Sequence, residues 1–214
     1  MRRLFLIFSW LVTIAAMAQQ GTAAEAQQGT AAEADYEEAV VDTTVVASSD
    51  IRSLFCEMPD SLLPFLSENN RLDMMDFMDS GMKAVVRNVF DGKSEMTALT
   101  DRYCRVSLTE ATMLEMAVLD IAATSEKVLC AVFTYGSTEV KESAVYFYTT
   151  DWQRLETSRF AALPQQELYV ASLSDEGAVL DIRITKALEQ PAIEGQEMAS
   201  KELTRLKWNG IKYN

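Results

Sequence analysis

The chain has 214 residues, of which 49% are hydrophobic, so it can form one domain of ordinary size or two small ones. Its formal net charge of −13 argues against nucleic-acid binding, which requires clustered Lys and Arg, and against charge-driven binding to an anionic membrane surface. Histidine is absent, which excludes the usual Ser-His-Asp and Cys-His catalytic arrangements and the commonest zinc ligand.

Residues 1–18 have the three parts of a secretion signal. Arg2 and Arg3 supply positive charge, residues 4–14 form an apolar run, and residues 16–18 (Ala-Met-Ala) form a small-residue cleavage site. The apolar run is too short to span a membrane readily, and no cysteine that could carry a lipid follows the predicted cleavage site. The sequence therefore predicts an exported protein, periplasmic or extracellular, with no transmembrane segment in the mature chain.

Residues 19–49 predict a flexible acidic leader. They begin with a duplicated octapeptide, QQGTAAEA, and they contain no Lys or Arg. The acidic residues are spread along the segment: Glu25, Glu33, Asp35, Glu37, Glu38 and Asp42. This composition favours a solvated spacer, and an interaction tail is the alternative.

The stretch from residue 50 to residue 92 carries the densest helix and turn signals. Asp50 is a good N-cap, because its carboxylate can accept hydrogen bonds from the first helical turn. Apolar residues follow at i, i+3, i+4 and i+7, on one helical face: Ile51, Leu54, Phe55 and Met58. Pro59 then ends this helix, and residues 61–66 (SLLPFL) predict a tight turn or a single helical turn.

A second helix is predicted over residues 71–80, with Asn70 as its N-cap and Gly81 as its stop. We expect apolar side chains of both helices to share one buried face that covers the sheet: Phe55, Met58, Phe77 and Met78. Three carboxylates on the other side form the solvated face of the helix, and the alternatives are a cation site or an electronegative docking ridge: Asp73, Asp76 and Asp79.

Strand signals dominate the rest of the chain. Residues 84–99 predict a β-hairpin with Asp91 and Gly92 as a two-residue type I′ turn, although a helix continuing through Val85 is the alternative for the first arm. A short helix is expected near Pro164, and a loop over residues 190–196. Alternating, apolar or β-branched runs predict further strands: 103–108, 112–121, 127–135, 143–149, 178–185 and 202–208. The alternation in 178–185 and 202–208 predicts one wet and one buried face for those strands.

These elements predict an α+β fold in a single domain, residues 50–214. Short N-terminal helices pack on a mostly antiparallel sheet built as a meander, because short polar turns join the strands. A half-barrel wrapped around the helices is the first alternative.

Four strings in this part of the chain resemble a secreted Bacteroidetes family known as domain of unknown function 3256. They read FCEMPDSLLPFLSENNRLDMMDFMDSGM, GKSEMTAL, SAVYFYTTDW and LKWNG, and the resemblance covers roughly residues 51–214. It implies an exported protein and a shared fold. It implies no activity, ligand or functional residue.

Aromatic residues near residue 150 are the candidate ligand-binding residues. Tyr146, Tyr148 and Trp152 could form one face of a platform for a carbohydrate or a peptide, since tyrosine is favoured at interfaces. Alternation along the strand places Phe147 on the opposite side from both tyrosines. The alternative is that these rings are ordinary core.

No metal or cofactor is predicted. The three cysteines have no C-x₂-C spacing; Cys104 and Cys130 either form a disulfide, if their strands are neighbours, or pack as buried thiols. Cys56 lies among apolar neighbours and is interpreted as a structural thiol. Methionines at helical spacing suggest core filling rather than Cu(I) binding: Met74, Met75, Met78 and Met82.

The sequence favours a non-enzymatic exported module that binds a partner protein, a peptide or a glycan in the cell envelope. A hydrolase that works through paired carboxylates is the first alternative, although no motif selects a pair among 32 acidic residues. A carrier that holds an apolar ligand between the helices and a curved sheet is the second.

Overall fold

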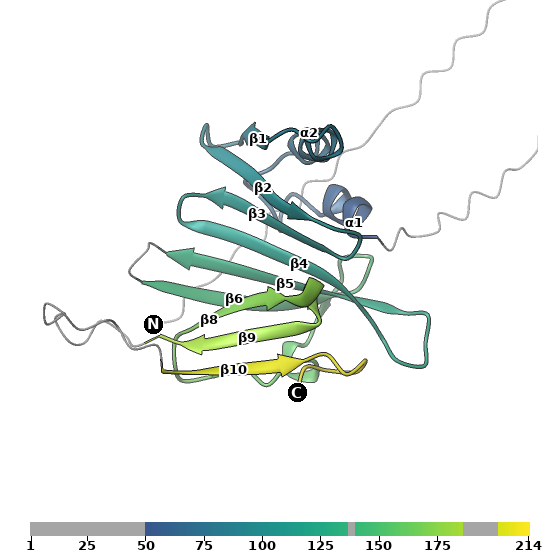
Figure 1. Ribbon diagram of the computed structural model, residues 1–214, viewed down its shortest axis with the longest axis vertical. Helices are drawn as coiled ribbons and strands as arrows, with labels where there is room; N and C mark the ends of the chain where they lie inside the picture. Colours follow the sequence, from purple (N-terminus) through teal and green to yellow (C-terminus); the bar gives the residue numbers. More distant parts are fainter. Residues whose placement is uncertain (1–49, 137–139, 186–200) are drawn as a thin grey trace, which may run out of the picture. The chain divides into compact units, whose positions relative to one another are not determined.

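The computed structural model describes residues 50–136, 140–185 and 201–214, all within the compact unit Thr44–Asn214. The predicted signal peptide (1–18), the acidic leader (19–49) and the loop at 190–196 lie outside the described residues. The described residues form two α-helices and two antiparallel sheets (Figure 1). The predicted α+β class, with helices on an antiparallel sheet, is therefore confirmed.

The first sheet has seven strands in the order in which they follow along the chain. Every pairing is antiparallel, as expected for a meander. The strands are β1 (Ala84–Arg87), β2 (Lys93–Leu99), β3 (Tyr103–Thr109), β4 (Thr112–Asp120), β5 (Lys127–Gly136), β6 (Lys141–Tyr148) and β7 (Arg154–Leu155). The sheet stays open, with β1 and β7 at its edges, and does not close into a barrel.

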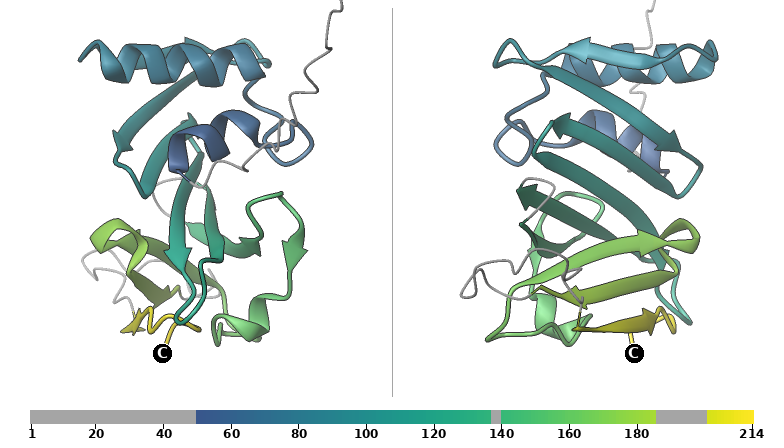
Figure 2. Two further views of the ribbon diagram at one scale, coloured as in Figure 1. Left: turned by 90° about the vertical axis from the view of Figure 1, so that its right-hand side faces the viewer. Right: turned by 60° about the vertical axis from the view of Figure 1, so that its left-hand side comes forward.

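The second sheet has three strands in the order β10-β9-β8. Its strands are β8 (Tyr169–Ser174), β9 (Val179–Ile184) and β10 (Lys201–Lys207). Figure 2 shows this sheet beside β5 and β6, whereas the helices gather near β1 to β4. Two 3₁₀ turns, η1 (Thr157–Arg159) and η2 (Asp175–Gly177), flank β8.

The helix predicted near Pro164 is wrong: η1 is the nearest helical turn, and it ends before this proline. Residues 165–168 are all exposed, so a helix there would have no apolar face to bury. Because short helices depend on such packing, the segment stays irregular.

Helix α1 (Ile51–Glu57) begins and ends as predicted. The Asp50 carboxylate accepts a hydrogen bond from the Ser53 amide at 2.9 Å, and the helix stops before Pro59. Within the described residues, neither α1 nor α2 is long and apolar enough to cross a membrane.

Helix α2 (Glu68–Asp79) begins earlier than predicted, because Ser67 rather than Asn70 is its N-cap. The hydroxyl of Ser67 accepts from the Asn70 amide, and the Asn70 side chain accepts from the Ser67 amide, both at 3.2 Å. This reciprocal capping box explains the error, since Asn70 is the third residue of the helix and part of the same cap.

The β1–β2 connection also differs from the prediction. Arg87 pairs with Lys93, so residues 88–92 form the loop in place of a two-residue turn. A type I′ turn needs a positive φ at both central residues, and only Asp91 has one, at 64°, whereas Gly92 does not. The buried side chain of Asn88 organises the loop instead: it accepts from the amides of Phe90 and Gly92 and donates to the Leu108 carbonyl.

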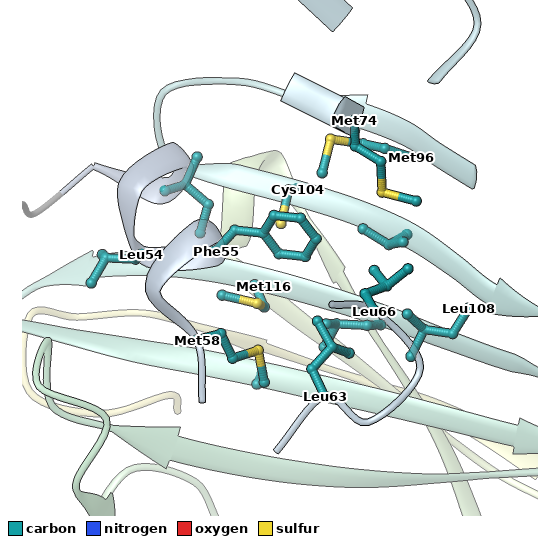
Figure 3. Close-up of a cluster of buried hydrophobic side chains, with 14 of the residues drawn as sticks. Leu54, Phe55, Met58, Leu63, Leu66, Met74, Met96, Cys104, Leu108 and Met116 are labelled. Atoms are coloured by element: carbon teal, nitrogen blue, oxygen red, sulfur yellow. The ribbon is translucent and has the colours of Figure 1, made fainter. Parts of the chain in front are cut away.

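The helices cover one face of the first sheet. Phe55 of α1 and Met58, the residue that follows the helix, are fully buried over β3 and β4, together with Leu63 and Leu66 from the turn between the helices (Figure 3). On α2, Met74 and Met75 are buried in this core, whereas Phe77 and Met78, whose burial the sequence predicts, pack against it and are only half-buried. The reason is the position of α2, which packs mainly on the edge strand β1.

The opposite face of the central strands is buried as well. Ala117 and Leu119 of β4 pack with Leu173 of β8 and Leu180 of β9 in a second core. The interior residues of β4 and β5 are therefore buried on both sides, whereas a sheet covered by the helices alone would leave one face in water. The second sheet causes the difference, because it covers the side that would otherwise face water.

All three cysteines are free. Cys104 pairs with Met116 and Cys130 pairs with Ala117, so β4 separates them and they point to opposite faces of the sheet. The disulfide is therefore not formed, and the thiols pack as core side chains. Burial raises the pKa of Cys104 to about 12, and that of Cys130 above its usual range as well, which keeps both thiols protonated and unreactive.

Candidate functional site

The three predicted ligand-binding residues lie together. Tyr146 and Tyr148 project from the same face of β6, and Trp152 occupies the turn that joins β6 to β7. The ring centroids of Tyr146 and Tyr148 are 6.4 Å apart, and those of Tyr148 and Trp152 are 5.6 Å apart. Their exposure differs, however: Tyr148 is 3% exposed and Trp152 is 9% exposed, while Tyr146 is half-buried. The three rings therefore do not form an open platform.

Further residues that the sequence analysis did not single out complete the cluster. The guanidinium carbon of Arg154 in β7 lies 4.0 Å from the centroid of the Tyr146 ring. On β5, Phe133 lies 6.0 Å from Tyr146 and is nearly parallel to Tyr135, at 10° between ring planes. The pairing register places these side chains on one face, because Ala131 pairs with Tyr146.

A partly open pocket of about 270 Å³ lies between this cluster and the turn that follows α1. One side is aromatic and polar and comes from the first sheet, and the other is mostly apolar and comes from residues 61–65. We call this site the tyrosine pocket, and its lining residues are Ser61, Leu62, Pro64, Phe65, Phe133, Tyr135, Tyr146, Tyr148 and Arg154. Trp152 does not line it but supports the ring of Tyr148.

The pocket carries neutral hydroxyls and one positive charge. Burial raises the pKa of Tyr135 and of Tyr148, so both phenols are protonated at neutral pH. The ion pairs closer than 4.0 Å in the described part of the chain do not include Arg154. The lining contains no Asp or Glu, so an acidic protein presents a cationic site here.

An exposed aromatic rim extends from the pocket. Phe65 packs edge-on against Phe90 with centroids 5.5 Å apart, and Phe90 is 65% exposed. The amide of Val89 donates to the Phe65 carbonyl at 3.0 Å, which ties the β1–β2 loop to the turn. Because Asn88 also braces this loop, Phe90 is presented on a well-bonded segment.

The backbone at Trp152 is strained. Its φ is 61°, unusual for a bulky residue, and its Nε1 is buried without a hydrogen-bond partner among the described residues. The turn compensates through local bonds, since the Trp152 amide donates to the Thr149 carbonyl at 3.1 Å and the Thr149 amide donates to the Gln153 carbonyl at 3.0 Å. Strain of this kind tends to persist next to functional sites.

Other candidates from the sequence have structural explanations. Asp73, Asp76 and Asp79 are exposed, and Asp79 forms a 2.6 Å ion pair with Arg52. In the described ranges, no group of three or more acidic or cysteine side chains is arranged to hold a metal ion. The solvated-face interpretation of these carboxylates therefore fits the structure.

The comparisons with known proteins concern the family and the fold. The sequence model of a family described as "Protein of unknown function (DUF3256)" matches residues 43–194, which agrees with the resemblance noted above. A solved structure described as a domain of an uncharacterized protein from Porphyromonas gingivalis W83 aligns with a TM-score of 0.62 and 23% identity, covering 76% of this chain and 96% of that one. The fold is therefore shared with a bacterial domain. No curated protein matches the chain.

Proposed function

The chain belongs to the DUF3256 family of proteins of unknown function, and we propose that it is an exported, non-enzymatic binding module of the cell envelope whose ligand site is the tyrosine pocket. The observation that carries this proposal is the juxtaposition of Tyr146, Tyr148 and Arg154 in one pocket. Tyrosine and arginine are among the residues most enriched at binding hot spots, because both combine a flat apolar surface with hydrogen-bond donors.

The alternative functions have less support. Glu115, the most deeply buried carboxylate among the described residues, already accepts hydrogen bonds from Tyr103, Arg105 and the Leu173 amide, which suits a structural role better than acid–base catalysis. Side chains fill the space between α1 and the sheet, where an apolar carrier would need room for its ligand (Figure 3).

A screen of ligands with matched variants tests the binding proposal. The chain without residues 1–18 is exposed to a displayed random-peptide library and to a panel of envelope oligosaccharides. We expect binders that lose affinity at least about tenfold with Tyr146→Ala, because a central aromatic contact is worth about 2 kcal/mol. Ile211→Ala, 66% exposed and outside the pocket lining, is the control and should leave affinity unchanged. Ligands that bind both variants as tightly as the wild type would place the site elsewhere.

Export rests on the signal features of residues 1–18 and is tested separately. Mass spectrometry of secreted or periplasmic material should find Gln19 at or near the N-terminus, as the Ala-Met-Ala site predicts. Recovery of exported protein that begins at Met1 would contradict signal cleavage.

A further inference from the structure

We infer that the tyrosine pocket binds the carboxyl-terminal residue of a peptide, with the terminal carboxylate at Arg154 and an apolar side chain against residues 61–65. This inference rests on the proposed function and names the chemical class of its ligand. The inference follows from the arrangement of the pocket, in which the positive charge of Arg154 lies on one side and the apolar surface of residues 61–65 lies on the other.

Arg154 is prepared to bind an anion. Its guanidinium lies over the rings of Tyr146 and Tyr148, at 4.0 and 5.8 Å from their centroids, which holds the side chain at the pocket. No described carboxylate pairs with it within 4.0 Å, so its hydrogen-bond donors are not taken up by an ion pair. A guanidinium fork matches a carboxylate in shape and can bind it through two parallel hydrogen bonds.

The opposite side of the pocket favours an apolar group next to the anion. Its apolar residues are Leu62, Pro64 and Phe65 of the turn, and Phe133 of β5 adds an apolar ring on the sheet side. An acidic sugar carries hydroxyls around its whole ring, and burying them against these residues without partners would cost free energy. The side chain of a terminal Leu or Phe has no such groups, so the apolar side of the pocket suits it better.

The size of the pocket agrees with a single terminal residue. Its volume of about 270 Å³ is just below the range of about 300–1,000 Å³ that is typical of sites for drug-sized ligands. The preceding residues of the peptide would leave over the rim, where Val89 and Phe90 are 56% and 65% exposed. This rim adds apolar contact without adding a second charge.

The test compares N-acetyl-Gly-Gly-Gly-Phe as a free acid with the same peptide as a C-terminal amide, titrated against the chain without residues 1–18. We expect the free acid to bind about tenfold more tightly or better, because a charge-assisted bidentate contact is lost in the amide. Arg154→Gln should abolish this preference. Arg159→Gln is the matched control, since Arg159 is also exposed and lies 5.6 Å from a ring, that of Phe160, outside the pocket.

Several outcomes would overturn the inference. Equal binding of acid and amide, or a preference for the acid that survives Arg154→Gln, would show that no carboxylate is held at Arg154. Tighter binding of glucuronic acid than of the peptide acid would assign the pocket to acidic sugars. Failure of both peptides while library ligands still depend on Tyr146 would overturn the terminal-residue inference alone, whereas the absence of any Tyr146-dependent ligand would overturn the proposed function as well.

Discussion

Glu115 joins the two sheets through a single buried carboxylate. Its side chain is fully buried, and one oxygen accepts from the Tyr103 hydroxyl at 2.6 Å and from Arg105 Nη2 at 2.7 Å. The other oxygen accepts, at 3.3 Å, from the backbone amide of Leu173 in β8, an edge strand of the second sheet. The charge of Glu115 is therefore satisfied by groups from both sheets, as a buried carboxylate requires.

Replacing this carboxylate should be costly. We expect Glu115→Ala to lower the free energy of unfolding by about 3 kcal/mol, because the Tyr103 hydroxyl and the Leu173 amide would lose their acceptor in the interior. Urea denaturation measures this change, with the dependence of the unfolding free energy on urea concentration expected to be the same in the variant and the wild type. Glu95→Ala is the control: Glu95 pairs with Lys83 at 3.2 Å, and the lysine side chain is 72% exposed, so the loss should stay within about 0.5 kcal/mol. Equal losses in the two variants would contradict the bridging role of Glu115.

The two helices contribute unequally to the buried core. Helix α1 inserts fully buried residues over the middle of the first sheet, whereas α2 lies on the edge strand β1 and leaves part of its apolar face half-buried. The acidic side of α2 faces water, as its sequence predicts. The order of the strands causes the difference, because β1 is the last strand on its side of the sheet.

One Phe→Ala substitution in each helix measures how much each helix contributes to stability. Phe55→Ala should lower the free energy of unfolding by about 3–5 kcal/mol, as expected for an aromatic ring removed from a closed core. Phe77→Ala should cost only about 1–2 kcal/mol, because less of that ring leaves water on folding. Chemical denaturation of both variants gives the comparison. If Phe77→Ala proved as costly as Phe55→Ala, Phe77 would belong to the closed core with Met74 and Met75.

The β1–β2 loop depends on one side chain. Asn88 accepts from the amides of Phe90 and Gly92 and donates to Ser94 Oγ and to the Leu108 carbonyl, at 2.9–3.1 Å. We expect Asn88→Ala to destabilise the protein by about 2–3 kcal/mol, since two loop amides lose their acceptor. Val89→Ala in the same loop, where the side chain is 56% exposed, should change stability by less than about 0.5 kcal/mol. Thermal unfolding of the two variants checks the difference, and a neutral Asn88→Ala would show that the backbone alone holds the loop.

For the whole molecule, we expect the described unit to be stable without its leader. Residues 19–49 carry few large apolar side chains and no basic residue, and this composition predicts that they bury too little surface to offset the entropy of ordering. Deleting them from the chain that starts at Gln19 should shift the melting temperature by less than about 2 °C, which calorimetry can measure. A fall of many degrees would mean that the leader packs on the unit and contributes to its stability.

The sequence by itself determined most of the local structure. Asp50 and Pro59 set the bounds of α1, and the β-branched and alternating runs predicted the long strands, because caps and periodicity act between residues close in the chain. The same reasoning missed the start of α2, where Ser67 and Asn70 are both good caps and only the full helix distinguishes them. It also suggested a tight turn at Asp91, because the role of Asn88 depends on partners in β2 and β3.

Tertiary structure decided the candidate site and the second buried face. Tyr146 and Tyr148 could be selected from the sequence, but their partners come from strand order and register: Phe133 lies on the neighbouring strand, and Phe65 comes from a distant turn. Arg154 belongs to a very short strand that carries no periodic signal, and the second sheet buries the side of β4 that the helices leave uncovered. Local sequence patterns indicate which side chains are apolar and will be buried. The packing of segments that are distant in the chain determines which elements cover them and where a pocket remains.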